Sequence, residues 1–205
     1  MGEHVSPMTR GVQRNPTAEA LVAGIGLGVV AQILRQVQGE PMQLGVATAP
    51  WLTVGFALAV WAARRRAGGR VLVAYLFAWL VAYHVLYALG QPVPFSAAFR
   101  EALPWLVLTL PVCLALAPAA VLARRRGIVG DVCLAAPISW SLPEALKNAQ
   151  RGDIVVAVAI TVLAFLPVAA AGRRDVRVVT VVVAVLAFGA LALAVGPIAR
   201  SHIHS

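Results

Sequence analysis

Three ionisable side chains lie within or beside long apolar stretches of this sequence, and they are the residues best suited to chemistry. His84 lies inside the apolar stretch 71–89, whereas Glu101 and Glu144 lie near the ends of two others. An ionisable group at the centre of a bilayer costs roughly 2.5–3.5 kcal/mol, so such residues are candidates for a functional role. If the stretches cross a membrane in turn, all three residues fall in its outer half.

Aromatic side chains accompany these three residues at helical spacing. The stretch that carries His84 has an aromatic residue at every fourth position, namely Tyr75, Trp79, Tyr83 and Tyr87. Residues four positions apart lie on one face of a helix. By the same spacing, Trp105 shares a helix face with Glu101, and Trp140 shares one with Glu144.

These residues permit two interpretations. In the first, an outward-facing cavity binds a small cationic or aromatic solute through cation–π and carboxylate contacts. Its lining would be His84, Glu144, Glu101, Tyr83, Tyr87, Trp105 and Trp140. In the second, the aromatic side chains form helix packing and an interfacial belt, and the two glutamates lie among lipid headgroups. His84 is then a neutral imidazole that is hydrogen-bonded to a neighbouring carbonyl.

The composition indicates which elements must position these residues. The chain has 205 residues, of which 60% are hydrophobic and 12% are charged. A soluble domain has about 45–50% apolar and about 25% charged residues. The apolar residues form long uninterrupted stretches, which excludes an ordinary soluble enzyme. We therefore predict an all-α fold, an integral membrane bundle of transmembrane helices.

Seven stretches could cross a bilayer, which requires about 20 apolar residues. Five contain no Asp, Glu, Lys or Arg, and they cover 44–63, 71–89, 102–123, 154–171 and 178–199. Two are weaker, because 18–34 contains Glu19 and Gln32, and 128–146 contains Asp131 and Glu144. We predict about seven transmembrane helices, or six if 128–146 does not span.

The net charge of +9 comes from arginines that are clustered between the apolar stretches. The clusters are 64–66, 124–126 and 173–174. Clusters in short loops orient membrane proteins with the positive side in the cytoplasm. This placement predicts a multi-pass protein of the cytoplasmic membrane whose amino terminus is cytoplasmic. It also argues against nucleic acid as the partner, and leaves the lipid bilayer as the expected one.

The domain organisation follows from the same pattern. We expect a cytoplasmic tail over 1–16, one membrane-embedded helical domain over 17–200, and a short tail over 201–205. Alternatively, 20–31 could be the apolar part of a cleaved secretory signal peptide. Within this stretch Ala20, Gly24 and Gly28 form a small-residue face. Such a face allows close approach of another helix, from this chain or from a membrane-protein partner.

Prolines interrupt two of the predicted spans. Pro104, Pro111 and Pro118 are seven residues apart, which places them on one helix face. Pro137 and Pro143 lie in the weaker stretch 128–146. Each proline frees a backbone carbonyl and tends to bend its helix. Bent helices with free carbonyls are one way in which transporters build binding sites, although they also serve packing alone.

The sequence lacks the motifs of catalysis. Its two cysteines, Cys113 and Cys133, lie in different predicted spans and form no C-x-x-C pair. His202 and His204 are too few ligands for a metal site. We therefore expect no catalytic residues, no metal and no cofactor, and we expect that the protein is not an enzyme.

Several short motifs extend over roughly residues 24–171. They are the stretch 24–34, Ala49-Pro50-Trp51 through Phe56, the arginines after Ala63, Val81-Ala82-Tyr83-His84, Trp105, and Leu134 through Pro143-Glu144-Ala145-Leu146. In these motifs the chain resembles a family of small bacterial multi-pass membrane proteins that has no established activity. The family pattern has a tyrosine where this chain has His84, and glycines where it has Pro118 and Pro137. The resemblance implies membrane location and a helical fold.

Two functions remain from the sequence. In the first, the protein binds or transports a small solute through the outward cavity, alone or as a subunit of a larger transporter. A vitamin-binding subunit of an energy-coupling transporter is similar in size and helix content. In the second, the protein is a non-catalytic membrane scaffold or assembly subunit of a larger complex.

Overall fold

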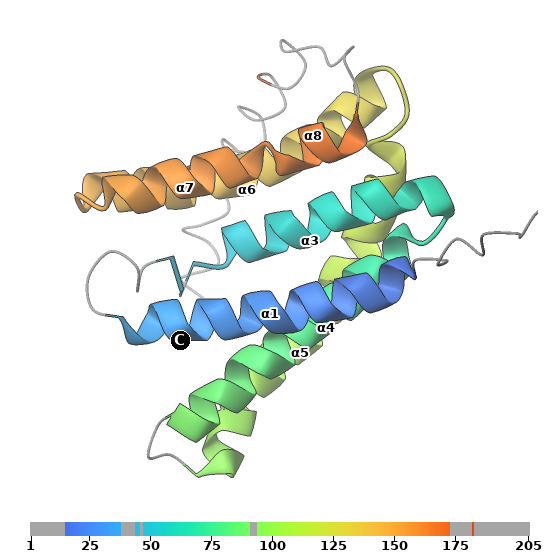
Figure 1. Ribbon diagram of the computed structural model, residues 1–205. Coiled ribbons are helices and arrows are strands. Elements are labelled where there is room, and N and C mark those ends of the chain that lie inside the picture. The colour runs from blue at the N-terminus through green and yellow to red at the C-terminus, as the bar shows by residue number, and fades with distance from the viewer. Residues whose placement is uncertain (1–14, 38–43, 46, 91–93, 173–181, 183–205) are drawn as a thin grey trace, which may run out of the picture.

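The computed structural model describes residues 15–37, 44–45, 47–90, 94–172 and 182. Their regular structure is helical throughout, and Figure 1 shows the order of the elements. They are α1 (Pro16–Gln36), α3 (Ala49–Ala62), the 3-10 turn η1 (Ala63–Arg65), α4 (Gly68–Gly90), α5 (Phe95–Leu122), α6 (Ile128–Gln150), α7 (Ile154–Ala164) and α8 (Leu166–Ala171). The predicted all-α fold is confirmed. The predicted span 178–199 lies outside the described residues, apart from Val182, so the structure does not confirm the count of seven.

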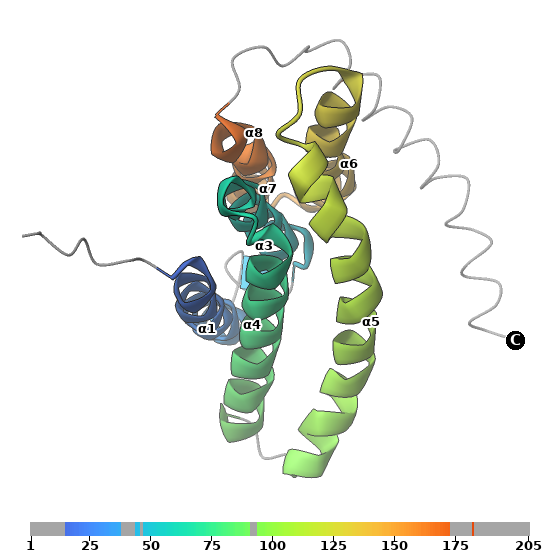
Figure 2. The same cartoon turned by 90° about the vertical axis from the view of Figure 1, so that its right-hand side faces the viewer.

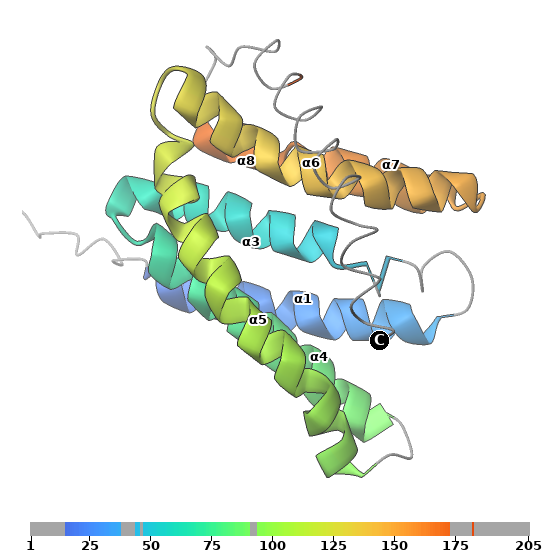
Figure 3. The same cartoon turned by 180° about the vertical axis from the view of Figure 1, so that it is seen from behind.

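The helices form a bundle around α3. On one side of α3 lie α1 and α4. On the other side lies α6, packed against the consecutive helices α7 and α8, as Figures 1 and 3 show. Helix α5 runs antiparallel to α4 and bows along its length in Figure 2. The fully buried side chains of Phe56, Val60, Leu72 and Tyr75 form the centre of the core, where α3 meets α4.

Four helical segments are long and apolar enough to cross a membrane. They are α1, α4, α5 and the continuous stretch Ile154–Ala171 that α7 and α8 form together. Several such helices in one chain indicate a membrane location. Helix α1 belongs to this set although its stretch is interrupted by Glu19 and Gln32, and it also packs along α4.

Helix α3 is shorter than the span 44–63 that the sequence predicts. It begins at Ala49 and has 14 residues, which at 1.5 Å each gives about 21 Å, less than the roughly 30 Å of a hydrocarbon core. Pro50 lies in its first turn. A longer helix would place this proline in its interior, where the ring clashes with a preceding carbonyl and the N–H is missing.

Helix α6 has 23 residues, so the weaker stretch 128–146 is helical and is longer than the sequence suggested. It lies antiparallel to α7, with Pro137 and Pro143 inside the helix. Thr53 of α3 and Ser141 of α6 are both buried, and their hydroxyl oxygens lie 3.3 Å apart. Helix α6 is not among the four segments that are apolar enough to span, and its crossing of the membrane stays a prediction.

The loops that carry two of the arginine clusters meet at one end of the bundle. Arg124 donates weak hydrogen bonds to the carbonyls of Val60 and Ala170, at 3.4 and 3.5 Å. Partial burial and the neighbouring Arg64 lower the pKa of Arg124 below its ordinary value. The connections after α3 and after α5 therefore lie on the same side, as the charge pattern requires.

The small-residue face of α1 packs against α4, which runs parallel to it. A Cβ atom at Gly24 would lie 2.5 Å from the carbonyl oxygen of Tyr75, and one at Gly28 would lie 2.5 Å from that of Trp79. Real Cβ atoms do not approach so closely, so glycine is required at both positions. The face thus has a partner within the chain, and a separate membrane-protein partner stays a prediction.

We expect Gly28→Ala to destabilise the protein by about 1–3 kcal/mol, because the new methyl group overlaps the α4 backbone. The matched control is Gly26→Ala, where a Cβ meets nothing within 4 Å. Gly26→Ala should leave the stability of the protein unchanged or raise it slightly, since alanine has a higher helix propensity than glycine. Thermal unfolding of the two variants in detergent measures the difference. Equal unfolding temperatures would contradict the tight contact of α1 with α4.

Candidate ligand-binding site

A hollow of about 250 Å³ lies at the end of the bundle opposite to Arg64 and Arg124. Four parts of the chain line it: the end of α1, the residues before α3, the second half of α4 and the first turns of α5. The lining residues are Arg35, Gly45, Ala47, Thr48, Trp79, Leu80, Tyr83, His84, Glu101 and Trp105. We call this the polar hollow. It brings together Tyr83, His84, Glu101 and Trp105 of the sequence-predicted site.

Arg35 is the member of the site that the sequence interpretation missed. Its Nη1 donates a hydrogen bond of 2.9 Å to the hydroxyl oxygen of Tyr83. Its guanidinium carbon lies 4.6 Å from the ring centre of Tyr87 and 5.8 Å from that of Tyr83, within cation–π range. The helical spacing of the sequence could have indicated Arg35. It follows Gly28 by seven positions, so it lies on the same face of the helix as the small residues. Tyr87 contacts Arg35 but does not itself line the polar hollow.

Stacked aromatic rings form one wall of the polar hollow. Trp51 of α3 stacks on Trp79 at 6.3 Å between ring centres, and Trp79 stacks on Tyr83 at 5.8 Å. The indole Nε1 of Trp79 is buried and has no hydrogen-bond partner among the described residues. Tyr75, the first of the four aromatic residues spaced along α4, lies in the core instead.

His84 makes the contact that the second interpretation expects. Its Nδ1 lies 3.0 Å from the carbonyl oxygen of Leu80, one turn earlier in α4. Since a carbonyl only accepts, Nδ1 carries the proton and Nε2 is left for another contact. The ring also packs edge-on against Tyr83, at 5.2 Å between centres. The bonded ring also lines the polar hollow, and a ligand-binding role for His84 stays a prediction.

Glu101 and Trp105 face the polar hollow from α5. This helix begins at Phe95, so Glu101 lies in its second turn and not at its start as the apolar stretch suggested. Its carboxylate is exposed, and among the described residues neither Glu101 nor Arg35 belongs to an ion pair. The hollow thus presents a positive and a negative group that do not neutralise each other directly.

Glu144 and Trp140 lie outside the polar hollow. Both carboxylate oxygens of Glu144 accept backbone N–H groups at the start of α3, from Thr48 at 3.2 Å and from Ala49 at 2.9 Å. Trp140 donates from Nε1 to Thr53 Oγ1 at 3.1 Å, and so lies between α3 and α6. Glu144 caps a helix whose first residues border the hollow, so it supports the wall and does not reach the interior.

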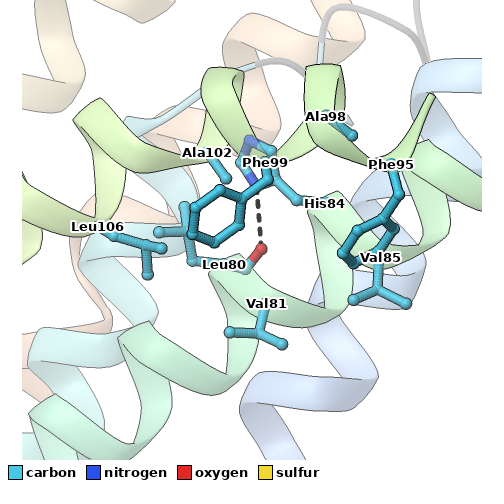
Figure 4. Close-up of a pocket in the computed structure, with 9 residues that line it drawn as sticks. All are labelled: Leu80, Val81, His84, Val85, Phe95, Ala98, Phe99, Ala102 and Leu106. Carbon is cyan, nitrogen blue, oxygen red and sulfur yellow. Dashed lines mark hydrogen bonds between the residues drawn. The ribbon is translucent and has the colours of Figure 1, made fainter. Parts of the chain in front are cut away.

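A second hollow of about 220 Å³ lies between α4 and α5, and Figure 4 shows its lining. We call it the apolar groove. Apart from His84 its lining is hydrocarbon, formed by Leu80, Val81, Val85, Phe95, Ala98, Phe99, Ala102 and Leu106. In Figure 4 the imidazole of His84 points from α4 toward α5.

Comparison with protein-family models, with curated proteins and with solved structures finds no match to this chain. Within the described part of the chain, no group of three or more His, Cys, Asp or Glu side chains could hold a metal ion. The site must therefore be interpreted from its own residues.

We expect Glu144→Ala to lower the free energy of unfolding by about 1 kcal/mol, because the first N–H groups of α3 lose their acceptor. The control is Lys147→Ala, an exposed position one turn further along α6. Chemical unfolding in detergent gives both values. A loss for Lys147→Ala as large as that for Glu144→Ala would contradict the capping role.

Proposed function

We propose that this protein is an integral membrane protein that binds a small charged solute in the polar hollow. The observation that carries the proposal is the convergence of Arg35, Glu101 and an aromatic wall from separate helices on one cavity. A guanidinium binds carboxylate or phosphate oxygens, and a carboxylate binds an ammonium group. The solute that fits best carries both an anionic and a cationic group.

Arg35 is well placed for this role because it is already held in position. The hydrogen bond to Tyr83 and the ring of Tyr87 fix the guanidinium, while its remaining N–H groups are available to a ligand. Fixing a side chain before binding lowers the entropy lost on binding. Trp79 and Trp105, which also line the hollow, add an apolar and cation–π surface to it.

The test is a thermal-stability screen of the detergent-purified protein against amino acids, amines and vitamins. We expect a zwitterionic compound to raise the unfolding temperature, and we expect Arg35→Gln or Glu101→Gln to remove most of this shift. Arg100→Gln is the control, because Arg100 is exposed beside Glu101 and does not line the hollow. If no compound shifts the unfolding temperature, or if the shift survives both variants, the binding proposal fails and the membrane scaffold becomes the better explanation.

We also propose that the arginine end faces the cytoplasm and that the polar hollow opens on the outer side. Arginine clusters in short loops mark the cytoplasmic side of multi-pass proteins. The bundle places the loops after α3 and α5 together, at the end away from Glu101. On this topology α6 crosses the membrane from the cytoplasm outward.

The two ends of α6 test this topology. In a background in which Cys113 and Cys133 are replaced by alanine, cysteines are placed at the exposed positions Ile128 and Gln150. We expect an impermeant thiol reagent to label Gln150→Cys in intact cells, and Ile128→Cys only after the membrane is opened. Labelling of both from outside, or of neither, would mean that α6 does not cross. Labelling of Ile128→Cys alone would invert the orientation.

A further inference from the structure

The polar hollow and the apolar groove are neighbours with a common wall. Leu80 and His84 line both of them. Each is smaller than the roughly 300–1,000 Å³ of a typical ligand pocket, and only the two together reach that range. His84 therefore borders both the lining that contains Arg35 and Glu101 and the hydrocarbon lining of the groove, the latter of which is drawn in Figure 4.

The apolar groove exists because of small residues on α5. Ala98 and Ala102 are buried and face α4, while the larger Phe95 and Phe99 flank them on the same helix. Figure 4 shows these phenylalanines on one side and Val81 and Val85 on the other, with the space between the two helices. Val81 and Phe99 are about half exposed, at 51% and 54%, so the groove is open along its rim.

We propose that the ligand is an amphiphile whose zwitterionic headgroup occupies the polar hollow and whose acyl chain lies in the apolar groove. This inference rests on the proposed function, because Arg35 and Glu101 bind the headgroup. Because Val81, Phe95 and Phe99 are exposed along the groove, a molecule in the bilayer would reach it laterally and need no aqueous path.

His84 marks the place where the headgroup joins the chain. It is the polar side chain in the lining of the groove, and its Nδ1 is committed to the Leu80 carbonyl. Nε2 then remains for a hydrogen bond at the boundary between the two hollows. An amphiphile changes from polar to apolar at one point, and this boundary matches that change.

The probes are myristoyl lysophosphatidylethanolamine, which has a zwitterionic headgroup with one acyl chain, and glycerophosphoethanolamine, which is the same headgroup without the chain. Affinities for the detergent-purified full chain are measured by thermal stabilisation and by native mass spectrometry. We expect the chain-bearing probe to bind at least about tenfold more tightly. Arg35→Gln should lower the affinity of both probes by about tenfold, because both lose a contact with a charged side chain.

Two variants separate binding in the groove from simple uptake into the detergent micelle. Val81→Trp fills the groove from its rim. The acylated probe should then bind no more tightly than glycerophosphoethanolamine, whose own affinity should not change. Val73→Trp is the matched control, since Val73 is an exposed valine of α4 that lines neither hollow. A series of shorter chains on the unaltered protein provides a measurement that does not depend on the variant. Affinity should rise with chain length and then stop rising when the groove is full.

The outcomes distinguish this inference from the proposed function. The amphiphile inference is overturned, and the solute site stands, if the headgroup probe binds and the acyl chain does not raise the affinity. The same holds if Val81→Trp and Val73→Trp have the same effect on that affinity. If affinity rises without limit along the chain series, the chain lies in the micelle and the inference is overturned. If neither probe binds and the solute screen is also negative, both proposals fall.

Discussion

Helix α1 lies so close to α4 that two carbonyl oxygens of α4 occupy the space where side chains of α1 would begin. Gly24 and Gly28 make this approach possible. In a membrane the burial of apolar surface does not drive helices together, so close backbone contact and van der Waals packing must do so. The rest of the site depends on this contact, because it brings Arg35 at the end of α1 within reach of Tyr83 and Tyr87.

The short helix α3 creates the second condition for the site. In lipid every backbone N–H group needs a partner within the protein, and a helix that begins below the bundle surface leaves its first N–H groups without one. Glu144 accepts two hydrogen bonds there. Gly45, Ala47 and Thr48, which precede α3, line the polar hollow. Pro50 and Glu144 thus leave open a space that a full-length helix would fill.

The distribution of polar groups follows the same physical rule. Thr53, Ser141 and Trp140 are satisfied by one another inside the bundle, where they fix α3 against α6. Arg35 and Glu101 both line the polar hollow, and among the described residues neither belongs to an ion pair. Charged side chains are expensive in lipid, so two of opposite sign that line one cavity without an ion pair are the feature that supports a binding role.

Local patterns of the sequence determined the all-α membrane character, the positions of most helices and the sharing of helix faces, such as that of Glu101 with Trp105. These follow from apolar length and from the 3.6-residue period, which involve only near neighbours in the chain. The tertiary structure decided which faces meet. It placed Arg35 in the site and turned Glu144 and Trp140 to supporting contacts with α3, because the approach of two helices depends on side-chain volumes on both. The position at which α3 begins also depended on tertiary contacts. The apolar stretch alone continues back through 44–48, whereas Pro50 and the distant Glu144 set the first residue of the helix.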